Sequence, residues 1–278
     1  MAFYYARTEL AESQVVIVGM PLDRTSSFNS GTRFGADIAR LGADNIETFS
    51  PYLMRDVADA RVCDSGNLEF RYDKPSAPLE LISATTRAHY EAGRRQVGIG
   101  GEHTVTPPIV AELVRIFPDL CVIQYDAHSD LRDSYLGERV CHATAMRRVL
   151  DVVSRQSLFQ LGIRSFANAE EMVESSVFPF EVISPLRKIR PIIGARPVYI
   201  SLDVDVLDPG VMPDVQTPQP GGCSYSDLVR SLAALDGLNI VGCDLVEVCP
   251  RTIQPSAGAS LAAELIRELI LLTASRGM

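Results

Sequence analysis

The stretch Leu120-Cys-Val-Ile-Gln-Tyr-Asp-Ala-His-Ser-Asp130 joins a short apolar run to a cluster of ionisable side chains. Residues 120–125 are apolar on both faces of an extended chain, which is typical of a strand buried in a parallel sheet. When helices cover such a sheet, ligands bind outside the carboxyl ends of its strands. We therefore expect Asp126–Asp130 to lie at the edge of the sheet where ligands bind.

Similar apolar runs alternate with amphipathic segments along most of the chain. The expected strands are Val15–Gly19, Gln96–Ile99, Leu158–Ile163, Pro197–Leu202 and Asn239–Cys243, and the expected helices are Pro78–Ala92, Pro107–Phe117, Thr144–Val153, Ala169–Ser175, Ser226–Ala234 and Ala259–Ala274. Ser226 is the expected N-cap of its helix. This alternation, without a repeat or a linker, predicts one doubly wound α/β domain over residues 1–278.

Composition and charge narrow the class of protein. Apolar residues make up 46% of the 278 residues and charged residues 22%, the balance of a globular protein. The net charge of -9 argues against nucleic acid and anionic membranes as partners, and it suits a small cationic substrate.

The cysteines and the chain's apolar runs indicate a cytoplasmic protein. None of the six cysteines forms a Cys-x-x-Cys pair, so we expect buried reduced thiols. Residues 1–10 have no basic segment followed by an apolar core, so no signal peptide is expected. No run of about 18 apolar residues is present, so no membrane span is expected either.

Four short motifs follow directly on expected strands and carry the polar chemistry. They are Gly100-Gly-Glu-His103, Asp126-Ala-His-Ser-Asp130, Cys141-His-Ala-Thr144 and Ser201-Leu-Asp-Val-Asp-Val-Leu-Asp208. Three of the four histidines lie in these motifs. Imidazole and carboxylate together are ligands of hard or borderline divalent metals.

Alternation along an extended chain predicts that Asp126, His128 and Asp130 project to one side. Asp203 and Asp205 repeat this spacing, and two such neighbouring aspartates repel unless a cation neutralises them. A solvated acidic loop is the alternative for the first motif. For Asp208, which precedes a proline, a structural role in a turn is the better interpretation.

The motifs together offer more ligands than one catalytic zinc ion uses. The six candidates are His103, Asp126, His128, Asp130, Asp203 and Asp205. This number fits two ions that share carboxylates, and the excess of carboxylate over thiolate favours Mn²⁺. His103 taken alone would more often be a structural histidine, placed by the glycines before it.

Two further residues are candidates for catalysis. His142 can act as a proton shuttle, or it can be a surface histidine at a helix terminus. Glu247 follows a strand and can hold a cationic group through both carboxylate oxygens, or else Asp244 and Glu247 serve as caps or ion pairs. We assign no function to His89.

The motifs, with Pro220-Gly-Gly222 and Asp244-Leu-Val-Glu-Val248, resemble those of the ureohydrolases, the arginase and agmatinase family, and occur in the same order. Gly31-Thr-Arg-Phe-Gly35 also resembles the family's N-terminal segment. The resemblance implies a three-layer α/β/α fold around a mostly parallel sheet of about eight strands.

The same resemblance implies a chemistry and an assembly. Two Mn²⁺ ions would sit on the six ligands, and a bridging hydroxide, oriented by Asp130, would attack a guanidinium carbon to release urea and an amine. His142 would pass protons to the leaving amine, and Glu247 would hold the guanidinium. A homo-oligomer, either a trimer or a hexamer, is also implied.

The loop Leu131–His142 resembles that of agmatinases, so agmatine, which yields putrescine and urea, is the expected substrate. Glu102 and Pro213-Asp-Val-Gln-Thr217 depart from the family's usual sequence. Arginine, guanidinobutyrate, aminopropylagmatine and formiminoglutamate remain alternative substrates. A deacetylase-like enzyme with one zinc ion and an inactive assembly subunit are alternatives of other classes.

Overall fold

The computed structural model describes residues 1–172 and 176–274. Its centre is a sheet of eight parallel strands in the order β4-β1-β5-β10-β9-β6-β7-β8. The strands are β1 Val15–Met20, β4 Val62–Asn67, β5 Arg95–Gly100, β6 Cys121–Tyr125, β7 Leu158–Leu161, β8 Val177–Phe178, β9 Pro197–Asp203 and β10 Asn239–Val246. The predicted parallel sheet of about eight strands is confirmed. A two-stranded antiparallel sheet pairs β2 Phe49–Ser50 with β3 Arg55–Asp56.

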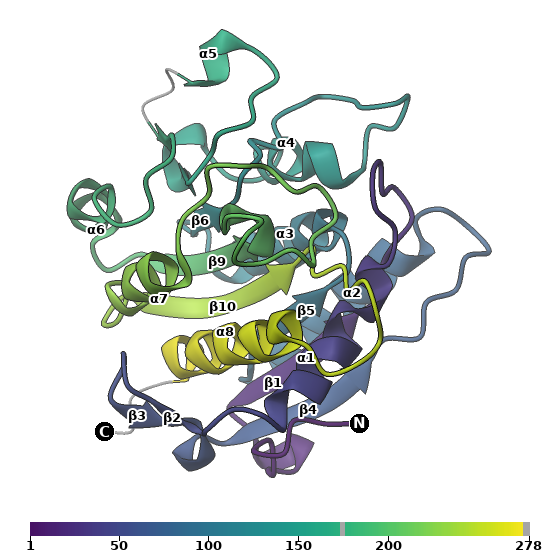
Figure 1. Ribbon diagram of the computed structural model, residues 1–278, viewed down its shortest axis with the longest axis vertical. Helices are drawn as coiled ribbons and strands as arrows, with labels where there is room; N and C mark the ends of the chain where they lie inside the picture. Colours follow the sequence, from purple (N-terminus) through teal and green to yellow (C-terminus); the bar gives the residue numbers. More distant parts are fainter. Residues whose placement is uncertain (173–175, 275–278) are drawn as a thin grey trace.

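Helices cover both faces of the sheet (Figure 1). One face packs against α1 Gly35–Ala43, α6 Leu186–Ile193, α7 Tyr225–Ala233 and α8 Ala257–Thr273. The other packs against α2 Ala77–Glu91, α3 Thr106–Ile116 and α4 Ala145–Val149. Short elements complete the chain, namely α5 Ala169–Met172 and the 3-10 helices η1 Leu10–Glu12, η2 Thr32–Phe34, η3 Val57–Asp59, η4 His103–Val105, η5 His142–Thr144, η6 Arg155–Ser157 and η7 Val204–Val206. The expected α/β/α layering is therefore confirmed.

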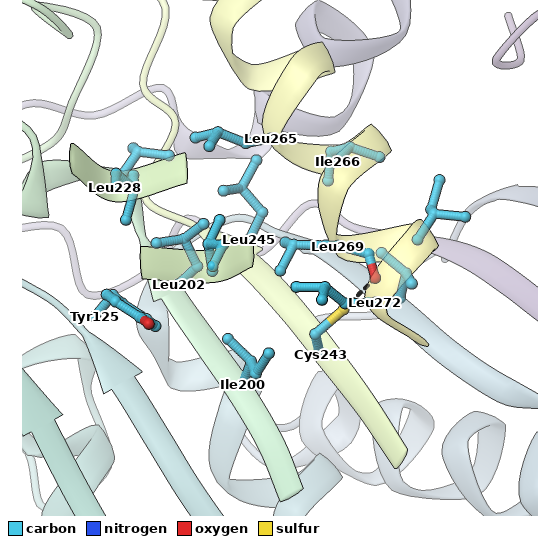
Figure 2. Packing of buried hydrophobic residues seen from close by; sticks show 14 of the residues in the cluster. Tyr125, Ile200, Leu202, Leu228, Cys243, Leu245, Leu265, Ile266, Leu269 and Leu272 are labelled. Atoms are coloured by element: carbon cyan, nitrogen blue, oxygen red, sulfur yellow. Dashed lines mark hydrogen bonds between the residues drawn. The ribbon is translucent and has the colours of Figure 1, made fainter. Parts of the chain in front are cut away.

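The larger apolar cluster lies between the sheet and the layer that contains α8 (Figure 2). Leu265 and Leu269 of α8 pack over Leu202 of β9 and Leu245 of β10, and all four are fully buried. Each such side chain contributes about 1.5–3 kcal/mol when it leaves water. This burial supports α8, which is apolar on most of its surface and nearly enclosed.

The structure adds elements that have no apolar run in the sequence. The edge strand β4 reads Val-Cys-Asp-Ser-Gly-Asn, and half-buried polar residues dominate it, so hydrophobic patterning does not reveal it. Helices α1 and α6 and the two-residue strand β8 were likewise not predicted. All six cysteines are free thiols, four of them buried and Cys63 and Cys223 half-buried.

Some helix boundaries differ from the prediction. The N-cap of α7 is Ser224, whose hydroxyl accepts a hydrogen bond from the backbone N–H of Asp227, so the assignment of Ser226 was wrong. The helix α4 ends at Val149, and turns replace the last predicted residues. Residues 173–175 of the predicted Ala169–Ser175 helix lie outside the described residues. Among the described residues, no helix has the length and apolarity needed to cross a membrane.

The polar motifs converge because β5, β10, β9 and β6 are neighbours at the centre of the sheet. Their carboxyl ends meet at one edge, so the four segments that follow them lie side by side. Gly101 permits a close approach there, because a Cβ at this position would lie 1.8 Å from the carbonyl oxygen of Leu22. The glycine therefore serves packing between segments.

Candidate active site

Two groups of potential metal ligands lie at the carboxyl edge of the sheet. The first consists of His103, Asp126 and Asp203, and the second of Asp126, His128 and Asp205. Within each group the ligand atoms lie within 4.8 Å of one another. Asp126 belongs to both, which is the arrangement expected of a carboxylate shared by two cations.

Asp130, the candidate ligand that belongs to neither group, lies close to His103 of the first group. The Nδ1 atom of His103 lies 3.1 Å from an oxygen of Asp126, 3.1 Å from one of Asp130 and 3.4 Å from one of Asp203. In the second group, Nδ1 of His128 lies 2.9 Å from Asp205 Oδ2 and 3.6 Å from Asp126 Oδ1. The structure thus brings all six sequence-predicted ligands together.

Alternation along an extended strand, which we expected to bring Asp126, His128 and Asp130 to one side, does not explain their convergence. The strand β6 ends at Tyr125, and Asp126, His128 and Asp130 lie in the loop after it. Asp130 adopts a left-handed backbone with φ 53°, which is uncommon for a residue other than glycine. Glu247 does the same with φ 65°. Such strain persists only where surrounding structure enforces it, and it is concentrated at functional sites.

The buried polar atoms of this cluster fit a cation. Within the described chain, His103 Nδ1, Asp205 Oδ2 and Glu247 Oε2 are buried and make no hydrogen bond of good geometry, although the first two lie close to charged groups of the cluster. An unsatisfied buried polar atom costs about 1–3 kcal/mol. Imidazole nitrogen and carboxylate oxygen are suitable donors to a divalent metal, so a bound cation would satisfy these atoms.

The electrostatics of the cluster also show a deficit of positive charge. Burial raises the pKa of Asp203 well above its usual value, and the charges of Asp205 and Asp126 raise it further. Burial and the charge of Asp126 raise the pKa of Asp130 to about 6. Neighbouring cations would reverse these shifts, because they favour the charged form of a carboxyl group.

A hydrogen-bonded network behind His103 orients its ring. Ser201 Oγ lies 3.0 Å from His103 Nε2 and donates to Asp244 Oδ1 at 2.8 Å. Thr106 and Tyr199 donate to the other oxygen of Asp244, each at 2.7 Å. Asp244 is therefore a buried supporting residue, and Nδ1 of His103 remains directed at the carboxylates.

A cavity of about 220 Å³ opens over the cluster, and the two catalytic candidates line it. His142 and Glu247 are 8% and 2% exposed. The backbone N–H of His103 donates to Glu247 Oε1 at 2.6 Å, so Oε2 is the freer oxygen for a ligand. Burial raises the pKa of Glu247 well above its usual value, the hydrogen bond from His103 lowers it, and the charge of Glu102 raises it.

His142 is a buried histidine of the cavity wall, so its interpretation as a surface residue was wrong. Its Nε2 lies 3.1 Å from Ser27 Oγ, and its ring meets that of Tyr135 edge to face, with centroids 5.9 Å apart. Burial lowers the pKa of His142, although the charge of Glu102 opposes this effect. The ring is therefore neutral near pH 7 and has one nitrogen available to accept a proton.

Several residues of the cavity were not found from the sequence. Ser27, Arg132, Tyr135 and Phe166 line it. They come from loops, where no periodic pattern reports which side chains meet. The turn interpretation of Asp208 agrees with the structure, since its carboxylate accepts hydrogen bonds from the backbone of Gly210, Gly221 and Gly222. His89 lies in α2 and was assigned no function.

Comparison with known proteins identifies the family. The arginase family model matches residues 13–272. An agmatinase of Bacillus anthracis is 35% identical over 275 residues, which cover 97% of this chain and 95% of that protein. A guanidinopropionase of Pseudomonas aeruginosa is 32% identical over 301 residues, 97% of this chain and 89% of that protein.

The fold agrees with these similarities. The crystal structure of the agmatine ureohydrolase of Thermoplasma volcanium superposes with a TM-score of 0.85 at 28% identity, over 98% of this chain and 94% of that one. The chain belongs to the arginase family of metal-dependent hydrolases.

Proposed function

We propose that this protein hydrolyses the guanidinium group of agmatine to urea and putrescine, with two Mn²⁺ ions. One observation carries the proposal: Asp126 is shared by two ligand groups beneath a cavity that His142 and Glu247 line. A shared carboxylate, a buried base and a buried anion are the parts that hydrolysis of a cationic guanidine requires.

The six residues would hold the metal as two overlapping sets. His103, Asp126, Asp130 and Asp203 would bind one ion, and Asp126, His128 and Asp205 the other. The ions, when bound, supply the Lewis acidity that makes water a nucleophile at neutral pH. A donor set with four carboxylates, two imidazoles and no thiolate suits Mn²⁺ better than Zn²⁺.

Glu247 would bind the guanidinium of the substrate. Its Oε2 atom has no hydrogen-bond partner within the described chain, and the residue lines the cavity. A guanidinium N–H can donate to this oxygen, and the pairing of opposite charges stabilises the ionised carboxylate. Glu247 thus fixes the guanidinium carbon over the ligand cluster.

His142 would transfer protons between water and the leaving amine. The ring lies in the cavity wall, and Ser27 beside Nε2 also lines the cavity. A neutral imidazole can take a proton when the nucleophile forms and deliver it to the departing nitrogen. Asp130, close to His103 at the floor, would orient the attacking water.

The assignment of agmatine as the substrate is supported by the similarity to agmatinases and by the charged residues near the cavity. Glu171 lies behind the cavity wall, where Oε2 accepts hydrogen bonds from Ser129 Oγ at 2.5 Å and from the backbone N–H of Ala167 at 3.1 Å. Ser129 and Ala167 both line the cavity. A negative charge behind the cavity wall can attract the ammonium group of agmatine.

A guanidine with a carboxylate at its far end is the second candidate. Arg132 lines the cavity and stacks over the ring of Tyr135 at 5.4 Å, so it places a positive charge in the wall. A guanidinium side chain pairs well with a carboxylate. The 32% identity to a guanidinopropionase supports the same class.

A substrate panel decides between these candidates. Protein loaded with Mn²⁺ would be incubated with agmatine, arginine, 4-guanidinobutyrate and 3-guanidinopropionate, and urea would be measured. We expect the highest kcat/KM for agmatine, with putrescine as the second product. Preference for a guanidino acid would transfer the assignment to the second candidate, and absence of urea from every guanidine would contradict hydrolysis.

The metal content and the assembly are part of the proposal. Two ions per chain are expected by elemental analysis, whereas one zinc ion per chain would favour a deacetylase-like enzyme.

We propose that residues 1–278 form one catalytic domain of a cytoplasmic trimer or hexamer. Light scattering measures the number of chains directly.

A further inference from the structure

We propose that Thr25 and Glu102 position His142 and hold it in the tautomer with the proton on Nδ1, which leaves the lone pair of Nε2 to act as the base. This inference rests on the proposed role of His142 and adds two residues, neither of them a metal ligand, to the machinery of the site. The two residues lie in different loops, and the fold brings them to one side of the imidazole.

The hydroxyl of Thr25 connects the histidine to the carboxylate. Thr25 Oγ1 lies 3.1 Å from His142 Nδ1 and donates to Glu102 Oε1 at 3.0 Å. It also accepts a hydrogen bond of 3.1 Å from the backbone N–H of His142. The threonine therefore holds both the ring and the main chain of the histidine.

Both carboxylate oxygens of Glu102 accept hydrogen bonds from other groups as well. Its Oε1 also accepts from Thr104 Oγ1 at 2.9 Å, and its Oε2 accepts from the backbone N–H groups of Arg24 and Thr25 at 2.8 Å and 2.6 Å. The side chain is fully buried. Three donors other than the Thr25 hydroxyl are thus directed at its two oxygens, and Oε1 serves as the acceptor for that hydroxyl.

Counting hydrogens then decides the tautomer. A threonine hydroxyl has one hydrogen and two acceptor lone pairs. Its hydrogen goes to Glu102, so Thr25 can only accept from the ring, and Nδ1 of His142 must carry the proton. Nε2 then has a lone pair, which lies beside Ser27 in the wall of the substrate cavity.

In many enzymes a carboxylate orients a histidine base by a direct hydrogen bond. Here the hydroxyl of a threonine lies between the carboxylate and the histidine.

Nitrogen-15 NMR tests the tautomer without reference to substrate. Histidine-labelled protein would be studied both metal-free and loaded with diamagnetic Zn²⁺, with His142 assigned from the signals lost in His142→Ala. We expect protonation at Nδ1 in the wild type, and a shift towards protonation at Nε2 in Thr25→Val. Protonation at Nε2 in the wild type, or an unchanged spectrum in Thr25→Val, would overturn the proposal.

Thr104→Val is the matched control, because Thr104 donates to the same oxygen of Glu102 without touching His142. It should keep the wild-type tautomer, as should the conservative Thr25→Ser. Glu102→Gln provides a second perturbation, because its amide can donate to Thr25 and reverse the direction of the hydrogen bond.

Turnover of agmatine gives the second readout. Groups that orient a working side chain typically contribute about 10–100-fold, so kcat should fall by about that factor in Thr25→Val, with KM and metal content little changed. Thr25→Ser should recover most of the rate. An equal loss in Thr104→Val would contradict the positioning role. Failure of the agmatine assignment would leave the NMR result unaffected, so the two proposals fail separately.

Discussion

Two clusters of buried charge in this protein contrast sharply. Between α1 and β4, Arg40 donates to both oxygens of Asp64 at 2.8 and 2.9 Å and to Asn67 at 2.5 Å. The side chains of Arg40 and Asp64 are each 1% exposed. At the active site, by contrast, buried carboxylates outnumber their cationic partners, and His103 and Asp205 retain unsatisfied atoms.

Structural and functional charges in this fold differ in whether the chain itself supplies every partner. The Arg40 cluster is complete within the chain, so it has nothing to offer a ligand. The active-site cluster contains two groups of candidate metal ligands, so we expect a bound cation to contribute to its stability. The following experiments break each cluster in turn.

The largest expected effect comes from removing the shared ligand. Asp126→Ala should strip the metal and abolish measurable turnover, because Asp126 belongs to both ligand groups. Metal content by elemental analysis and urea release measure the two consequences.

Asp208→Asn is the matched control for this change, since Asp208 is a carboxylate of the neighbouring motif whose hydrogen bonds, among the described residues, come from backbone N–H groups. It should retain two ions. Retention of both ions in Asp126→Ala would refute the shared-ligand assignment.

Removing His142 should lower the rate of catalysis at the active site without removing the metal. His142→Ala should keep its metal but lose about 10²–10⁴-fold in kcat, the usual contribution of a general acid–base group. Steady-state kinetics on a metal-replete sample would measure this loss. A near-normal rate would exclude His142 from proton transfer.

Breaking the ion pair of Arg40 and Asp64 should lower the stability of the fold instead of metal binding. Arg40→Met leaves Asp64 buried without its partner, and loss of one member of a buried ion pair costs about 3–5 kcal/mol of stability. Denaturant unfolding measures the change, while metal content of the folded fraction should be unaltered. A stability loss matched by loss of metal would show that the two clusters are coupled.

The same pair predicts a pH dependence with a defined sign. Burial raises the pKa of Asp64, but the hydrogen bond and charge of Arg40 outweigh it, so the pKa lies below its usual value. A lowered pKa contributes stability above the usual carboxyl range, and this stability is lost as pH falls. The stability difference between wild type and Arg40→Met should therefore shrink as pH falls below about 4. A difference that stays constant or grows at low pH would contradict this assignment.

The smallest effect is expected from Glu171, behind the cavity wall. Glu171→Gln removes the charge behind Ser129, so KM for agmatine should rise several-fold while kcat and metal content stay nearly constant. The neighbouring exposed Glu170, changed to Gln, is the control. An unchanged KM would leave Glu171 as a purely structural acceptor for Ser129 and Ala167.

The sequence was informative wherever the signal is local. Buried strands such as Cys121–Tyr125 appear as short apolar runs, and each ligand motif follows such a run directly. The edge strand Val62–Asn67 escaped detection, because half-buried polar residues dominate it and no apolar run marks it. The N-cap of α7 was misplaced by two residues, because serines at 224 and 226 both fit the local pattern.

What the sequence alone determined is therefore the layered class of the fold, the six ligand candidates, and His142 and Glu247. The tertiary structure decided which of these residues lie in one group of candidate ligands, and which oxygen of Glu247 has no hydrogen bond within the described residues. It also decided that Thr25 contacts both His142, 117 residues away along the chain, and Glu102, 77 residues away. The physical reason is that strand patterns depend on neighbours along the chain. Hydrogen-bond partners and cavity walls depend on which strand ends become neighbours in the sheet.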